Sequence, residues 1–146
     1  MFNDFLQRMR EITGQDGHLK DKRDIRMLNP LVLAYIGDTV YDLFVRSWLI
    51  FQFDQSVHQL HMKAIHFVKA KAQSDTLHRI LDRLNEEEKR IFRRGRNAKS
   101  GYIPKNADVG EYHTATGFEA VLGYLYLAGN DTRLMEILKM TLEEHE

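Results

Sequence analysis

Apolar residues recur every three or four positions along nearly the whole chain, which is the spacing of one face of an α-helix. Near the N-terminus this stripe is formed by Phe2, Phe5, Leu6, Met9 and Ile12. The chain has only two prolines, and no segment sustains the period-two alternation of a half-buried strand. The pattern therefore predicts an all-α fold.

Sequence signals locate the ends of several helices. Asn29 is a favourable N-cap and Pro30 suits the first helical position, so a helix is expected from there to about residue 51. Asn85, followed three residues later by Glu88, is a variant of the capping box. After an N-terminal helix and a polar loop (14–26), the expected helices are 31–51, 56–68, 69–84, 86–98, 108–128 and one that starts at residue 131. We expect a single domain of six or seven helices.

The composition fits one soluble domain. The 146 residues, 43% of them hydrophobic, suffice for one sizeable core. The chain has no cysteine, which excludes disulfides, cysteine-based zinc sites and a thiol nucleophile. The longest apolar stretch contains Asp38, Asp42 and Arg46, and such charges cost about 2.5–3.5 kcal/mol each in a bilayer. Since no signal-like segment opens the chain, we expect a cytoplasmic protein that does not bind membranes.

An acidic residue stands in the middle of the most apolar helix. Residues 31–51 are apolar almost all round, so we expect this helix to be buried in a core or an interface. Asp38 follows Gly37 there, and a buried carboxylate needs a partner. A hydrogen bond or an ion pair with Arg46 is the commoner explanation, and a metal ion is the alternative. Asp42 lies four residues from both Asp38 and Arg46, which favours a helical ion pair for it.

The 108–128 helix repeats this feature with Glu119, which stands among large apolar and small residues. Two helices that each bring an acid into shared apolar surroundings can hold a divalent cation between them. Mg²⁺ takes oxygen ligands and keeps several of its waters, so a few carboxylates suffice. The residues alone leave the pairing of Asp38 with Glu119 open. His58 and His61 share a helical face but lack a third ligand, which favours a solvated surface.

The net charge is zero, with 21 basic and 21 acidic residues, but one segment is strongly basic. Residues 89–105 contain no acid and seven cationic side chains: Lys89, Arg90, Arg93, Arg94, Arg96, Lys99 and Lys105. Local charge, rather than net charge, decides where a phosphate backbone docks. The segment therefore predicts a nucleic-acid contact, with a solvated helix face as the alternative.

Three segments together resemble a known family. Residues 33–40, Leu-Ala-Tyr-Ile-Gly-Asp-Thr-Val, resemble the first signature of ribonuclease III, and residues 118–127, Phe-Glu-Ala-Val-Leu-Gly-Tyr-Leu-Tyr-Leu, resemble its second. Between them, residues 93–101 and 104–106 are similar to the basic segment of the Mini-ribonuclease III branch. The resemblance covers residues 28–130 in the family's order and spacing. It implies a ribonuclease III-like catalytic domain over 27–146, with the N-terminal helix and polar loop of residues 1–26 outside the match.

The resemblance implies a Mg²⁺-dependent endoribonuclease, with Mn²⁺ as an alternative metal. Asp38 and Glu119 would be its catalytic residues and metal ligands. The residues expected to contact RNA are Arg93, Arg94, Arg96, Lys99, Lys105 and Asn106. Ribonuclease III proper has two further acids, at the positions held here by Ala34 and Thr116, and the Mini branch is similar in lacking both. This departure leaves the number of bound metals open, and Thr116 is expected to hold a water through its hydroxyl group.

The resemblance also implies a homodimer that hydrolyses both strands of double-stranded RNA with a Mg²⁺-activated water, leaving 5′-phosphate and 3′-hydroxyl ends. The expected physiological substrate is precursor 23S ribosomal RNA, matured at its 5′ and 3′ ends. No double-stranded RNA-binding domain is expected after the catalytic domain, which would then grip the duplex itself. The alternatives are a non-catalytic helical RNA-binding module, which would not need acids in apolar helices, and an unrelated metal phosphohydrolase, which would not need a basic patch.

Overall fold

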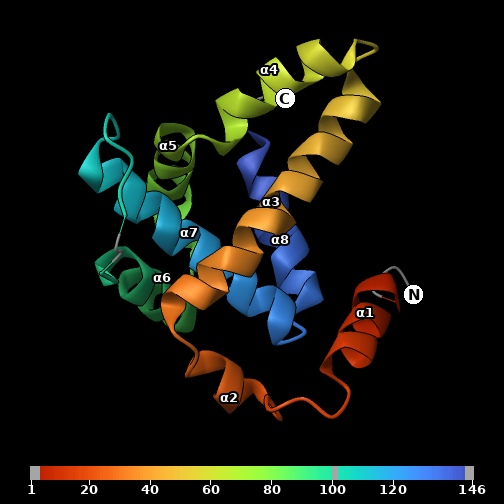
Figure 1. The fold of residues 1–146 in the computed structure, drawn as a ribbon, viewed down its shortest axis with the longest axis vertical. Coiled ribbons are helices and arrows are strands. Elements are labelled where there is room, and N and C mark those ends of the chain that lie inside the picture. Colours follow the sequence, from red (N-terminus) through yellow and green to blue (C-terminus); the bar gives the residue numbers. More distant parts are fainter. Residues whose placement is uncertain (1–3, 100–101, 144–146) are drawn as a thin grey trace.

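The computed structural model describes residues 4–99 and 102–143, and within these ranges all regular structure is helical (Figure 1). The elements in chain order are α1 (Asp4–Gly14), α2 (Lys22–Arg26), α3 (Pro30–Gln52), α4 (Val57–Val68), α5 (Ala70–Ile80), the 3₁₀ turn η1 (Leu81–Arg83), α6 (Glu86–Asn97), α7 (Val109–Leu127) and α8 (Asp131–Thr141). The predicted all-α fold is confirmed, with eight α-helices over the described residues where six or seven were expected.

Two predicted elements differ from the structure. The segment expected to be a polar loop contains the short helix α2, which Asp21 caps by accepting a hydrogen bond from the Asp24 backbone (3.0 Å). Within the helix expected over 69–84, the α-helix α5 ends at Ile80 and is followed by the 3₁₀ turn η1. Phe2 of the N-terminal stripe lies outside the described residues.

The predicted helix starts are confirmed by their caps. Asn29 accepts a hydrogen bond from the second residue of α3 (2.9 Å), and Pro30 is its first residue. Asn85 and Glu88 form a complete capping box, with reciprocal bonds of 2.8 and 2.9 Å. Asp108 caps α7 by accepting one hydrogen bond, from the Glu111 backbone N–H group (2.9 Å). Each bond satisfies a backbone N–H group that the first helical turn leaves without a partner.

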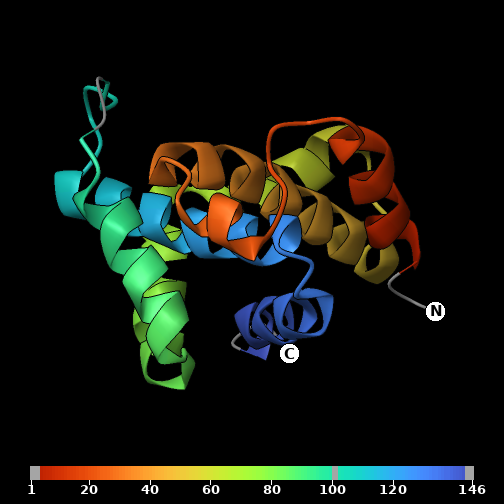
Figure 2. The same cartoon turned by 90° about the horizontal axis from the view of Figure 1, so that it is seen from below.

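α7 is the central helix of the fold. Every residue from 114 to 126 is buried except Glu119, which is half-buried. Figure 2 shows α7 between α3 on one side and α8 on the other, and α5 and α6 also pack against it. The core formed in this way includes Tyr41 and Phe118, whose rings meet edge to face at 5.3 Å. A carboxylic acid therefore stands in the most buried helix of the protein.

α3 and α7 cross at two glycines. A Cβ atom added to Gly37 would overlap the backbone carbonyl of Glu119, and one added to Gly123 would overlap the carbonyl of Leu33. Only residues without a side chain allow the two backbones to approach this closely. The crossing fixes the position of α3 on α7 and with it the residues on either side of Gly37.

The prediction that α3 is buried all round holds for one face only. Its inner face packs on α7 and is buried: Leu33, Ala34, Gly37, Tyr41, Val45 and Leu49. Its outer face exposes Tyr35 (80%), Leu43 (60%) and Ile50 (64%), so the described residues leave this face uncovered. The sequence predicted that α3 is buried in a core or in an interface, and the core buries only its inner face. Over the described residues, no helix is both long and apolar enough to cross a membrane.

The N-terminal helix α1 is anchored to the other end of the chain. The Arg10 guanidinium donates to both carboxylate oxygens of Asp131 (2.9 and 2.6 Å) and to the Tyr126 carbonyl (3.0 Å). Asp131 is buried at the start of α8, so this charged pair is shielded from solvent on one side. α1 thus belongs to the same folded unit, although its residues lie outside the sequence resemblance.

The helix crossing gives a first testable prediction. Gly37→Ala forces a methyl group into the α7 backbone, so the free energy of unfolding in urea should fall by about 1–3 kcal/mol or more, as overpacking does. The matched control is Gly110→Ala, in the exposed first turn of α7, where a Cβ meets only the Asp108 carboxylate at 3.4 Å. Equal stability of the two variants would show that the close approach is not required.

Candidate active site

The α3–α7 crossing brings Asp38 and Glu119 together. Gly37 packs on the Glu119 carbonyl, and Asp38 is the next residue of α3. Asp38 is exposed at the edge of α3, whereas Glu119 is half-buried on α7. Their carboxyl groups are hydrogen-bond partners. The acids that the sequence left unpaired thus lie side by side, but Asp38 is not the buried carboxylate that the apolar pattern predicted.

Burial and the neighbouring acid raise the pKa of Glu119 to about 9. Burial is the larger cause because it disfavours the charged form, and Asp38 adds a hydrogen bond and its own negative charge. One contact acts in the opposite direction: Gln73 Nε2 donates to Glu119 Oε2 (3.2 Å), which lowers the pKa. In the metal-free protein, Glu119 therefore holds a proton at neutral pH.

Gln73 is the site residue that the sequence analysis missed. It lies on the buried face of α5, four residues before Leu77 and seven before Ile80. Its Nε2 also donates to the Val68 carbonyl (2.8 Å), at the end of α4. Gln73 therefore joins α4, α5 and α7 at the acid pair. A polar residue at a core position of an amphipathic helix was the signal that could have revealed it.

Asp42 is accounted for by a structural ion pair, as its spacing predicted. Its carboxylate forms an ion pair with Arg46, one turn further along α3, with 3.0 Å between Asp42 Oδ2 and Arg46 Nε. Arg46, which the sequence suggested as a possible partner of Asp38, is therefore paired with Asp42. Asp38 faces Glu119 instead, so the two acids of α3 have different surroundings.

Ala34 and Thr116 occupy the two positions at which ribonuclease III proper has further acids, and both make local contacts. Ala34 is buried against the core, and the Thr116 hydroxyl donates to the Tyr112 carbonyl (3.0 Å) within α7. The hydroxyl oxygen of Thr116 still has acceptor capacity. Over residues 4–99 and 102–143, no group of three or more acidic, histidine or cysteine side chains is placed to hold a metal ion. The candidate centre therefore consists of two carboxylates.

The basic segment does not form one surface, because α6 turns its cations in different directions. Arg94 donates to the carbonyls of Arg26 (2.6 Å) and Leu28 (2.9 Å), in the connection between α2 and α3. Both bonds hold the start of α3 against α6. Arg94 thus has a structural role that its place in a run of cations did not predict.

Other cations of α6 lie on a second face. Lys89, Arg93 and Arg96, at positions i, i+4 and i+7, line an open groove of about 580 Å³ that α5 completes with His78 and Arg79. Lys99, Lys105 and Asn106 lie in the connection from α6 to α7 and are exposed. Figure 2 shows the described part of this connection standing out from the helices, on the side of α7 that α3 covers. Exposed cations are therefore available both there and in the groove.

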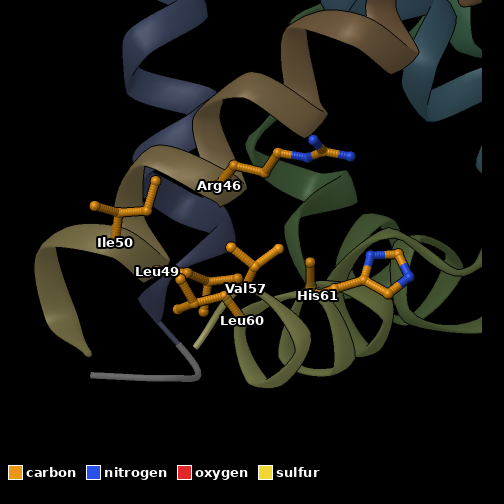
Figure 3. A pocket seen from close by; sticks show the side chains of 7 residues that line it. Arg46, Leu49, Ile50, Val57, Leu60 and His61 are labelled. Atoms are coloured by element: carbon orange, nitrogen blue, oxygen red, sulfur yellow. The ribbon is translucent and has the colours of Figure 1, made fainter. Parts of the chain in front are cut away.

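A separate apolar pocket lies between α3 and α4, at the end of this helix pair remote from α6 (Figure 3). Its volume is about 250 Å³, and Leu49, Ile50, Val57 and Leu60 form most of its wall. Arg46 and His61 are also among its lining residues. Since no carboxylate lines this pocket, it offers no ligand set for a cation.

Comparisons with known proteins decide the family. A model of the ribonuclease III domain matches residues 31–130. A Mini-ribonuclease 3 of Clostridium tetani is 52% identical over 126 residues, which cover 86% of this chain and 83% of that protein. A Mini-ribonuclease 3 of Thermoanaerobacter is 50% identical, over 88% of this chain and 91% of the relative. A crystal structure of a Fusobacterium nucleatum protein has a TM-score of 0.75 at 32% identity and covers 84% of this chain and 98% of that one. The chain belongs to the ribonuclease III family.

Membership of the ribonuclease III family confirms both the predicted ribonuclease III-like fold and the predicted class of enzyme, an endoribonuclease. It excludes the alternative of an unrelated phosphohydrolase. The matched range contains both acids and the whole basic segment of residues 89–105. Enzymes of this family generally depend on a divalent metal. The acid pair fits such an ion, because it offers oxygen ligands and because a cation could replace the proton that Glu119 holds.

The pKa of Glu119 gives a second prediction, for the protein in EDTA. The unfolded chain releases this proton near pH 4.5 and the folded chain near pH 9, so proton binding stabilises the fold fully below pH 4.5. That contribution is lost as the pH rises towards 9. The free energy of unfolding of the wild type should therefore fall relative to that of Glu119→Gln over this range. A constant difference between the two proteins from pH 5 to 9 would show that Glu119 ionises normally.

Proposed function

We propose that this chain hydrolyses phosphodiester bonds of double-stranded RNA at a Mg²⁺ site formed by Asp38 and Glu119, leaving 5′-phosphate and 3′-hydroxyl ends. The observation that carries the proposal is the acid pair itself. Glu119 interrupts an otherwise buried stretch of α7, and a second acid faces it across a helix crossing built on glycine. Neighbouring acids in poorly solvated surroundings destabilise each other unless a proton or a cation lies between them. Mn²⁺ would serve as the alternative ion.

The residues of the site have different roles in binding the metal ion. Asp38, at the exposed edge of α3, is the ligand that an ion in solution meets first, and Glu119 is the ligand held against the core. Glu119 must release its proton as the ion binds, and the N–H group of Gln73 favours the resulting carboxylate. When bound, Mg²⁺ supplies the positive charge that activates water and offsets the negative charge developing on the phosphate. Thr116 would orient a water through its hydroxyl oxygen.

RNA would be held through its phosphates by the exposed cations near the site. The residues that we retain for this role are Arg93, Arg96, Lys99, Lys105 and Asn106. Arg94 is left out because two backbone carbonyls occupy its guanidinium. Phosphate contacts position a duplex without reading its sequence. Recognition would depend on the shape of the A-form helix and on its 2′-hydroxyl groups.

The outer face of α3 supports a homodimer. Tyr35, Leu43 and Ile50 are large, apolar and exposed on one helix, and such patches mark interaction surfaces. In a dimer built on this face, each subunit would direct one acid pair to one strand of the duplex. By resemblance to Mini-ribonuclease III, we propose precursor 23S ribosomal RNA, processed in the cytoplasm at its 5′ and 3′ ends, as the natural substrate.

A third prediction tests the acid pair. Asp38→Asn keeps the size of the side chain but removes a metal ligand, so cleavage of an end-labelled RNA duplex in Mg²⁺ should fall by at least about a thousandfold. Duplex binding in EDTA should remain within about twofold of the wild type. The matched control is Asp42→Asn, on the same helix, which breaks only an exposed ion pair worth about 0.3–0.5 kcal/mol and should leave cleavage nearly unchanged. If Asp38→Asn cuts as well as Asp42→Asn, the proposed site is wrong.

Binding without cleavage by the wild type in Mg²⁺ would favour the non-catalytic RNA-binding module.

A fourth prediction tests the RNA contacts. Replacing Lys99 and Lys105 together by alanine should weaken duplex binding and reduce the slope of log K against log salt by about one unit per lost phosphate contact. Lys139→Ala, an exposed cation on α8, is the control and should leave the slope unchanged. A double variant with the wild-type slope would place the RNA elsewhere on the molecule.

A further inference from the structure

Gln73 occupies an unusual position for a polar side chain. It is only 2% exposed, on the first turns of α5, where the end of α4 and the middle of α7 meet. Its Nε2 donates to the Val68 carbonyl at 2.8 Å and to Glu119 Oε2 at 3.2 Å. The side-chain nitrogen thus joins a backbone group of fixed position to one oxygen of the buried acid.

The bond to Val68 determines which way the amide faces. A side-chain amide carries its donors on one end and its acceptor on the other. Reversing the Gln73 amide would place an oxygen against the Val68 carbonyl, which can only accept, and that bond would be lost. A donor is therefore held towards Glu119 by the architecture of the α4–α5 junction.

The bond to the end of α4 does not by itself account for this arrangement, because the same nitrogen also reaches Glu119. Gln73 Oε1 is buried and accepts no hydrogen bond within the described part of the chain. Leaving a buried acceptor without a partner costs about 1–3 kcal/mol. An apolar side chain would avoid that cost, but it would leave both the Val68 carbonyl and the Glu119 carboxyl group without a donor. The amide is therefore best explained by the two contacts together.

We propose that Gln73 is a positioning residue of the active site, whose amide, held by the Val68 carbonyl, orients the Glu119 carboxylate for binding a divalent cation beside Asp38. The inference rests on the proposed function. In this role Gln73 acts through Glu119, the metal ligand to which its amide donates. Partners of this kind, one step removed from a metal, typically contribute about ten- to a hundredfold to metal affinity or activity.

The test is Mn²⁺ binding to the dimer or monomer as purified, without RNA, followed by electron paramagnetic resonance. Gln73→Met keeps the length of the side chain and removes both hydrogen bonds. It should weaken Mn²⁺ binding by about ten- to a hundredfold. In cleavage assays, kcat at low Mg²⁺ should fall and recover at high Mg²⁺, while KM for the duplex stays within about twofold.

The control is Ser74→Ala, which alters the neighbouring buried residue of α5 and should leave Mn²⁺ affinity unchanged. Thermal unfolding in EDTA separates loss of fold from loss of metal. If Gln73→Met does not fold, Gln73→Asn decides, since its shorter amide cannot reach both Val68 and Glu119 and should bind Mn²⁺ more weakly.

Wild-type Mn²⁺ affinity in a folded Gln73→Met or Gln73→Asn variant would overturn the role of Gln73 while leaving the acid pair intact. A wild-type protein whose Mn²⁺ binding is the same as that of Asp38→Asn would instead overturn the proposed metal site, and the role of Gln73 with it. The two failures are therefore distinguishable in one series of titrations.

Discussion

The close crossing of α3 and α7 is the contact on which the rest of the structure depends. Two glycines let the helix backbones meet where any side chain would overlap a carbonyl group. α7 is the centre of the core, so α3 is fixed to the most buried helix of the described structure. An acid directly after Gly37 is thereby fixed against an acid on α7. Packing and chemistry have the same origin here, because the contact that holds the helices also forms the site.

The acid pair is a local conflict that the fold tolerates. A carboxylic acid half-buried in the central helix, with a second acid beside it, has its pKa raised to about 9. Without a cation, a proton must relieve the repulsion, and Gln73 supplies the one hydrogen bond in the described structure that favours the ionised form of Glu119. Departures from ordinary packing rules occur preferentially at functional sites. The arrangement is poorly suited to stability and well suited to a divalent ion.

Helix ends could be predicted from the sequence because they depend on short-range hydrogen bonds. Asn29, Asn85 and Asp108 cap the helices that their positions indicated. The pairing of Asp38 with Glu119 could not be derived from the pattern, since 81 residues separate them; the family resemblance supplied it. The short helix α2 was missed because its five residues include a single apolar one, Ile25, and carry no periodicity.

Other properties depend on tertiary contacts that no linear pattern contains. The apolar residues of α3 do not reveal which of them face α7, so its exposed outer face was not predicted. The cations of residues 89–105 are adjacent in sequence, but successive residues of a helix point about 100° apart. Arg94 consequently donates two hydrogen bonds to the connection before α3, while Arg93 lines the groove that α6 forms with α5. Gln73 was overlooked because its importance lies in a partner 46 residues away.

The most direct measurement is a crystal structure of the protein soaked in Mn²⁺, with anomalous scattering used to locate the ion. We expect an anomalous peak between the Asp38 and Glu119 carboxylates, with Gln73 still donating to Glu119. The ligand distances should be about 2.0–2.3 Å, as for small divalent ions bound by oxygen. A peak confined to other carboxylates, such as Asp42, or no peak at a Mn²⁺ concentration that supports cleavage, would show that Asp38 and Glu119 do not form the metal site.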